Sequence, residues 1–274
     1  MARSKFLVIK QIRNNSIEEI NAIPNKYFTF GVEIECWNVE KRRLQASLKD
    51  NANIESLIMG YNHQDQATAY KLGDDGSIRG FGACELVSPI LTNFDSLKKV
   101  CTLLNEHGAQ VNASCGLHVH FGVKNFSCKQ IIKLLLDYNK IQNIVDEFFP
   151  QSRRDSRYCL HLRSREVENL KRLFEKDENA LNMGDVMDAV DERYRTINVK
   201  SYYNHKTIEF RQHNGTTNYL KIRAWILFLL SFINLSLKGF DFSQVRTFED
   251  LPINQTIIPH FKKRIEKFRT ATND

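Results

Sequence analysis

Four short segments alternate apolar residues with carboxylates, imidazoles or other polar groups, and this alternation constrains the fold more than any other feature. In FGVEIECW (30–37), Glu33 and Glu35 each stand between apolar residues. Because adjacent residues of a β-strand point to opposite faces, such a segment buries one face and presents the other. The remaining segments are LHVHFG (117–122), TINVK (196–200) and TIEFRQH (207–213). The pattern predicts a sheet with one apolar and one polar face.

The polar face has an unusual composition. An ordinary half-solvated sheet would explain any one segment, but its wet face normally mixes Lys, Thr, Ser and Gln. Here carboxylates, imidazoles and one arginine dominate, and neighbouring carboxylates repel each other unless cations neutralise them. The predicted cluster consists of Glu33, Glu35, Glu209 and, from ELVSP (85–89), Glu85. Such an oxygen-rich pocket suits Mg²⁺, or alternatively Mn²⁺, better than zinc.

The order of the expected elements favours an α+β fold. We expect strands near 27–38, 84–88, 116–123, 194–200 and 206–213, and helices near 50–60, 95–107, 127–149, 219–238 and 258–269. Helical segments are also expected between 166 and 191. Since strands and helices do not alternate regularly, we predict a mostly antiparallel curved sheet with helices packed on one face. The length of 274 residues and a 42% hydrophobic content favour one domain over 1–274.

Composition favours a cytoplasmic protein without a membrane span. No signal-peptide pattern is expected at the N-terminus, and the longest apolar run, 224–237, is too short to cross a bilayer. The six cysteines occur singly, with no CxxC pair, which fits a reducing compartment. The net charge of +7 suits an anionic ligand such as a nucleotide and leaves nucleic-acid binding open. A solvated basic surface is the plainer explanation, particularly for FKKRIEKFR (261–269).

Six ordered motifs resemble the amidoligase family of the carboxylate–amine ligase superfamily, which includes glutamine synthetase. They are FGVEIE (30–35), DGSI (75–78), ELVSP (85–89), NASCGLHVHFG (112–122), ERYRTIN (192–198) and TIEFRQHNGT (207–216). None is decisive alone, but the ordered set is specific, and it spans about 28–225. The resemblance implies a glutamine-synthetase-like catalytic domain that uses ATP and Mg²⁺ to join an amine to a carboxylate.

The resemblance also implies residue roles. The metal ligands would be Glu33, Glu35, Glu85, His118 and Glu209. His120 matches a contact to the nucleotide phosphates, and Arg211 matches the cation that stabilises the transferring phosphoryl group; Glu209 and Arg211 would thus be catalytic. The remaining candidates for the nucleotide or substrate pocket are Arg193 and Asn198, assigned to the nucleotide, and Asp75 and Tyr194, assigned to the substrate. The substrates could be an amino acid, a peptide, a polyamine or a modified macromolecule.

Several of these residues also have a purely structural interpretation. Asp75 can simply shape an Asp-Gly turn, and Tyr194 can be a core aromatic. Cys115 is expected to be a small buried thiol, since the chemistry needs no nucleophile. His107 and His213 are expected at a helix end and a sheet edge. The Arg-rich stretch 151–165 is either a lid or carboxylate-binding loop, or a solvated connector.

Two other functions compete with the ligase hypothesis. A metal-dependent phosphoesterase or nuclease could use a similar carboxylate–histidine cluster, although the late Glu-x-Arg pattern argues against it. A non-catalytic nucleic-acid-binding protein would leave the glutamates as an unhelpful negative patch. A degenerate ligase retained as a nucleotide sensor is disfavoured, because all the motif carboxylates are present.

Overall fold

The alternating segments form strands in the computed structural model, which describes residues 29–60 and 68–270. The described residues fall into two compact units. We call residues 29–60, 68–121 and 212–226 the strand unit, and residues 122–211 and 227–270 the helical unit. Strand β7 (Thr207–Asn214) and helix α10 (Tyr219–Leu237) each continue from one unit into the other.

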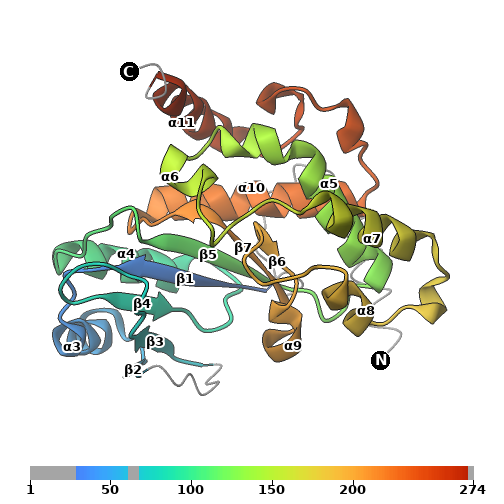
Figure 1. The fold of residues 1–274 in the computed structure, drawn as a ribbon. Helices are drawn as coiled ribbons and strands as arrows, with labels where there is room; N and C mark the ends of the chain where they lie inside the picture. Colours follow the sequence, from blue (N-terminus) through green and yellow to red (C-terminus); the bar gives the residue numbers. More distant parts are fainter. Residues whose placement is uncertain (1–28, 61–67, 271–274) are drawn as a thin grey trace. The chain divides into compact units, whose positions relative to one another are not determined.

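The strand unit is built on five strands in the hydrogen-bonded order β2-β3-β4-β1-β5. Their bounds are β1 Phe30–Cys36, β2 Ser56–Ile58, β3 Tyr70–Gly73, β4 Cys84–Val87 and β5 Gly116–Gly122. Only β2 and β3 pair in parallel; the other pairs are antiparallel. Helices α3 (Lys41–Ala52) and α4 (Asp95–Glu106) pack against each other in this unit (Figure 1).

The register of β1 and β5 confirms the predicted two-faced pattern. Directly opposed residues of neighbouring strands point to the same face, and Val32 lies opposite Val119 while Ile34 lies opposite Leu117. All four are buried. On the other face, Glu33 lies opposite His118. The side chains that the alternation assigned to one polar face therefore do share it within the strand unit.

The helical unit is organised around α5 (Cys128–Asp146), which lies beside α7 (Ser164–Glu175) (Figure 1). Ser127 and Gln130 form a capping box at the start of α5, which satisfies backbone N–H groups that a helix cannot pair internally. The other elements are α6 Gln151–Arg154, η1 Glu178–Ala180, α8 Met183–Asp188, β6 Ile197–Asn198, α9 Ser201–His205, η2 Phe242–Gln244, η3 Phe248–Asp250, η4 Gln255–Ile257 and α11 Ile258–Thr270.

An aromatic core fixes the apolar side of β7 in the helical unit. The ring of Phe210 lies 5.5 Å from that of Tyr138 on α5 and 6.4 Å from that of Phe232 on α10, centroid to centroid. Both contacts are edge-on, the arrangement that aromatic quadrupoles favour. With Phe210 held in this core, its neighbours Glu209 and Arg211 must project from the opposite side of the strand.

Helix α10 is the apolar helix expected near 219–238. Its length and composition alone would allow it to cross a membrane, yet 78% of its most apolar 18-residue window is buried inside the protein. A helix that is apolar all round and already covered by protein is a core helix. The structure thus agrees with the interpretation of this run as a buried helix.

Two predicted elements were wrong. The helix expected at 50–60 is instead α3, which ends at Asn53 in the left-handed conformation (φ 55°), followed by β2. The strand expected at 194–200 is reduced to the two residues of β6, because the chain turns where the Asn198 side chain accepts the N–H of Lys200 (3.0 Å). The α+β class and the mostly antiparallel pairing are confirmed.

Candidate active site

Glu33 lies at the centre of the polar face of the strand unit. Its Oε2 lies 2.9 Å from Nδ1 of His118, and its Oε1 lies 3.1 Å from Nε2 of His120. Burial raises the pKa of Glu33, but the charge of His120 and hydrogen bonds from both rings outweigh burial and hold the pKa well below its usual value. The side chain remains 23% exposed, so this carboxylate stays ionised and accessible.

Glu35, Glu85 and His118 form a second, deeper cluster in the same unit. Glu35 lies directly opposite Glu85 in the β1–β4 register, and one donor atom from each of the three residues lies within 4.8 Å of the others. All three are buried. The other Glu35 oxygen, Oε2, accepts the backbone N–H of Gly116 at 2.6 Å. This hydrogen bond fixes the carboxylate with Oε1 on the side of the His118 ring, 3.6 Å from Nε2.

The donor set of this cluster fits a hard divalent cation. Two buried carboxylates held side by side are costly unless a positive charge offsets them. Carboxylate oxygens with one imidazole match the ligand preference of Mg²⁺ or Mn²⁺, whereas zinc sites are usually richer in histidine and cysteine. Glu35, Glu85 and His118 could hold such an ion together.

Lys71 is a residue that the sequence analysis missed. It lies on β3 opposite Val87, which itself lies opposite Glu33, so the register places Lys71 on the polar face. Although charged, it is buried. A buried ammonium on this face supplies part of the charge that the carboxylates require. The sequence pattern does not indicate a strand at Lys71, because β3 spans only four residues and runs into a Gly-Asp-Asp-Gly turn.

Glu209 and Arg211 form an ion pair on the polar side of β7 in the helical unit. Glu209 lies opposite Asn198, whose Nδ2 donates to Glu209 Oε2 at 2.6 Å. Arg211 also donates from Nε to the carbonyl oxygen of Tyr158 at 3.1 Å, and Arg153 donates to the carbonyl oxygen of Arg211. The Arg-rich stretch therefore holds Arg211 in place, whatever further role it has.

Tyr194 and Arg193 adjoin this ion pair. The guanidinium of Arg211 lies 5.9 Å from the centre of the Tyr194 ring, and that of Arg193 lies 4.9 Å from it. Tyr194 is a partly exposed ring close to two cations rather than a core aromatic. Asp75 accepts the N–H of Ser77 at 2.7 Å, as its turn-shaping interpretation predicts.

Three further residues interpreted as structural, Cys115, His107 and His213, make defined contacts within the strand unit. The buried Cys115 uses its carbonyl oxygen to accept the N–H of Gly215 at 2.8 Å. His107 caps the end of α4 and contacts the hydroxyl of Ser47 at 2.8 Å. His213, expected at a sheet edge, is fully buried, with its ring 5.7 Å from that of Trp225.

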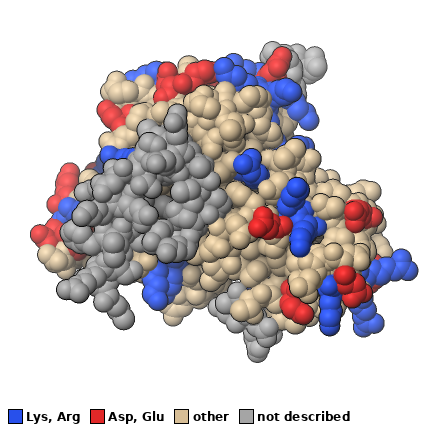
Figure 2. Space-filling view, turned by 180° about the vertical axis from the view of Figure 1, so that it is seen from behind, with Lys and Arg blue, Asp and Glu red and all other residues tan. Residues whose placement is uncertain are grey.

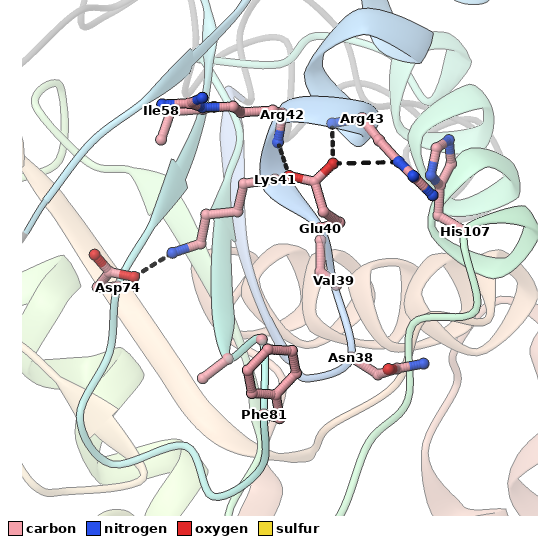
Figure 3. Close-up of a pocket in the computed structure, with 12 residues that line it drawn as sticks. Asn38, Val39, Glu40, Lys41, Arg42, Arg43, Ile58, Asp74, Phe81 and His107 are labelled. Atoms are coloured by element: carbon pink, nitrogen blue, oxygen red, sulfur yellow. Dashed lines mark hydrogen bonds and ion pairs between the residues drawn. The ribbon is translucent and has the colours of Figure 1, made fainter.

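A cavity of about 690 Å³ also opens in the strand unit (Figure 3). It is lined by residues 38–43, 58, 74, 81–83 and 107, and none of the predicted metal ligands lines it. Two sets of contacts join polar groups of its lining: Lys41 pairs with Asp74, and Glu40 accepts the backbone N–H groups of Arg42 and Arg43 (Figure 3). The cavity is therefore lined by residues other than the predicted metal ligands.

Comparison with known protein families matches residues 26–233 to the family described as putative amidoligase enzyme. The chain belongs to the amidoligase family. The matched range is close to the range of 28–225 that the motifs predicted. A search of curated proteins found no match.

Membership of the amidoligase family supports a ligase activity. The predicted site residues on β1, β4 and β5 gather within the strand unit: Glu33, Glu35, Glu85, His118 and His120. The predicted site residues from later in the sequence gather within the helical unit: Arg193, Tyr194, Asn198, Glu209 and Arg211. Each set is assembled by strand pairing and aromatic packing rather than by proximity in sequence.

Proposed function

We propose that this chain is an ATP- and magnesium-dependent carboxylate–amine ligase that forms an amide or isopeptide bond through an acyl phosphate. The observation that carries the proposal is the buried Glu35–Glu85–His118 cluster, beside Glu33 with its two imidazole partners. Family membership supports the same conclusion. The cluster would be an expensive feature in a protein that never binds a cation.

The chemistry explains why these groups are needed. A free carboxylate cannot release oxide, so a carboxylate oxygen first attacks the γ-phosphorus of ATP, and the bond from that phosphorus to the departing ADP oxygen breaks. The amine nitrogen then attacks the acyl carbon, the carbon–oxygen bond to phosphate breaks, and the amine loses a proton. The first step brings two anions together, so its barrier is largely electrostatic.

We assign the metal-ligand role to Glu33, Glu35, Glu85, His118 and Glu209. Bound Mg²⁺, or Mn²⁺, would supply positive charge across the β- and γ-phosphates. The protein's own contribution is to fix the ligands beforehand, as the Gly116 N–H does for Glu35.

Arg211 is assigned to the phosphoryl group. A fixed arginine aimed at a transferring phosphoryl group is worth about 10³-fold or more in rate. Arg211 is held on two sides, by Glu209 and by the Tyr158 carbonyl oxygen, and its side chain is 14% exposed. Such a constrained guanidinium needs no reorganisation during the reaction.

The remaining assignments rest on family motif positions. His120 and Asn198 are assigned to the nucleotide, and Asp75 and Tyr194 to the substrate. We assign Arg193, which the motifs placed at the nucleotide, to the acid substrate instead. We place the activity in the cytoplasm: all six cysteines lie in the described residues, and none of them forms a disulfide there.

The nucleic-acid-binding alternative has less support. Non-specific nucleic-acid binding depends on a continuous basic surface. On the face shown in Figure 2, Lys and Arg side chains are interspersed with Asp and Glu side chains over largely uncharged surface. Among the residues that the structure describes on that face, the basic side chains form no single patch.

The test is a screen of amine and carboxylate pairs for ADP release with Mg²⁺, followed by mass analysis of the product. Release that requires both substrates, together with a product lighter than their sum by one water, supports the ligase. Phosphate release that needs no ATP would favour the phosphoesterase alternative instead. The variant Glu35→Gln should abolish turnover, while Glu106→Gln, a charge change on the exposed end of α4, should not.

A further inference from the structure

Two Arg-Tyr pairs lie side by side in the helical unit. The sequence repeats the pattern Asp-x-Arg-Tyr at 155–158 and 191–194. The following residues pair in parallel, because Leu160 donates its N–H to the Tyr194 carbonyl oxygen and accepts the N–H of Thr196, both at 2.9 Å. The repeated dipeptides Arg157–Tyr158 and Arg193–Tyr194 therefore come from two adjacent segments of one unit.

The two pairs have the same internal geometry. In each, the guanidinium carbon lies 4.9 Å from the centre of the following tyrosine ring. In each, the arginine also donates to the hydroxyl of that tyrosine, at 2.8 Å for Tyr158 and 3.0 Å for Tyr194. The two rings contact each other edge-on at 5.4 Å. Stacking and hydrogen bonding hold each guanidinium in one orientation and leave its remaining N–H donors available.

Neither Arg157 nor Arg193 has a carboxylate partner among the described residues. Other exposed arginines of the helical unit do: Arg163, Arg165, Arg172 and Arg269. The acidic residues of the repeat are engaged elsewhere, since Asp191 pairs with Arg165 at 2.7 Å and Asp155 accepts from Gln151 at 2.8 Å. Within the described part of the chain, the positive charges of Arg157 and Arg193 therefore have no opposing carboxylate, although both side chains are held in one orientation.

We propose that Arg157 and Arg193 bind a second anionic group, a carboxylate, on the acid substrate, so that this substrate is a di- or polycarboxylate. The inference rests on the proposed function. Both tyrosines contact Arg211, Tyr158 through its carbonyl oxygen and Tyr194 through its ring. The substrate carboxylate that accepts the phosphoryl group is an anion and must approach the anionic ATP. Cations beside this substrate therefore lower the electrostatic barrier to phosphoryl transfer. Planar guanidinium groups match the two oxygens of a carboxylate.

The test is a calorimetric titration of the full-length protein without ATP. The two ligands are glutarate and glutaramate, its half-amide, in which an uncharged amide replaces one carboxylate. Wild-type protein should bind glutarate at least about tenfold more tightly than glutaramate, since a charge-assisted bidentate contact is lost with the second carboxylate. Arg157→Gln/Arg193→Gln should weaken glutarate binding about tenfold or more and change glutaramate binding by less than about twofold. The matched control is Arg172→Gln, which alters an exposed arginine on α7, away from the two Arg-Tyr pairs in sequence; this variant should bind glutarate like wild type.

A second titration uses magnesium–ADP, because its phosphate groups could bind the same arginine N–H donors. The affinity of the protein for magnesium–ADP should be unchanged in Arg157→Gln/Arg193→Gln. The proposal is overturned by absent saturable glutarate binding in the millimolar range, by equal binding of glutarate and glutaramate, or by a loss of magnesium–ADP affinity with glutarate binding intact. The titration needs no turnover, so its failure is distinguishable from a failure of the ligase proposal, which is judged on ADP release.

Discussion

Replacing Glu35 with glutamine should make the metal-free protein more stable. Glu35 and Glu85 are buried, and their ligand atoms lie within 4.8 Å. At an effective dielectric constant of about 20, two unit charges at that distance repel by about 3.5 kcal/mol. The amide oxygen of glutamine can still accept the Gly116 N–H, although the bond loses its charge assistance, at a cost of about 1 kcal/mol. The buried Lys71 on the same face offsets part of the repulsion, so the expected net gain is about 1–2 kcal/mol.

The assay is urea unfolding in EDTA and again with saturating Mn²⁺. Wild-type protein should gain about 2.7 kcal/mol when Mn²⁺ is present at about 100 times its dissociation constant. Glu35→Gln should be more stable than wild type in EDTA and gain little from Mn²⁺. Glu106→Gln should match wild type within about 0.5 kcal/mol in both conditions. A Glu35→Gln protein that is destabilised in EDTA, or that gains as much from Mn²⁺ as wild type, would refute the reasoning.

Three further predictions concern the helical unit. Arg211→Lys keeps the charge but loses the arginine geometry, so ADP release should fall about 10³-fold with little change in ATP affinity; near-normal turnover would remove Arg211 from the reaction. Glu166→Ala leaves the fully buried Arg195 without its 2.8 Å partner, and urea unfolding should detect a loss of about 3–5 kcal/mol; a loss below about 1 kcal/mol would contradict the pairing. Ser127→Ala removes the cap of α5 and should lower stability by about 1 kcal/mol, whereas an unchanged unfolding midpoint would show that the cap is not needed.

The polar face was predictable because strand alternation is a local property. Glu33, Glu35, His118 and His120 share a face for the reason that the sequence pattern implied, and β5 was predicted to within one residue. Ser127 likewise marks the start of α5 through its own side chain. Long, strongly patterned elements of this kind carry their structure in neighbouring residues.

What the sequence could not provide came from tertiary context. Lys71 belongs to a four-residue strand that only its partners define, so nothing local marks it as part of the site. The contact between Arg211 and the Tyr158 carbonyl oxygen joins segments 53 residues apart. A backbone acceptor leaves no signature in side-chain patterns. The two Arg-Tyr pairs are adjacent because Leu160 and Arg195 pair, a long-range contact that the sequence pattern does not indicate.

The central claim is that a substrate carboxylate is activated by phosphorylation before the amine attacks. The most direct measurement is oxygen transfer: a carboxylate substrate found in the ADP-release screen is labelled with ¹⁸O, and the inorganic phosphate is analysed by mass spectrometry. An acyl phosphate requires that one carboxylate oxygen leave with the phosphate, so the account predicts one ¹⁸O in each phosphate released. Phosphate that carries no label from the substrate would contradict it.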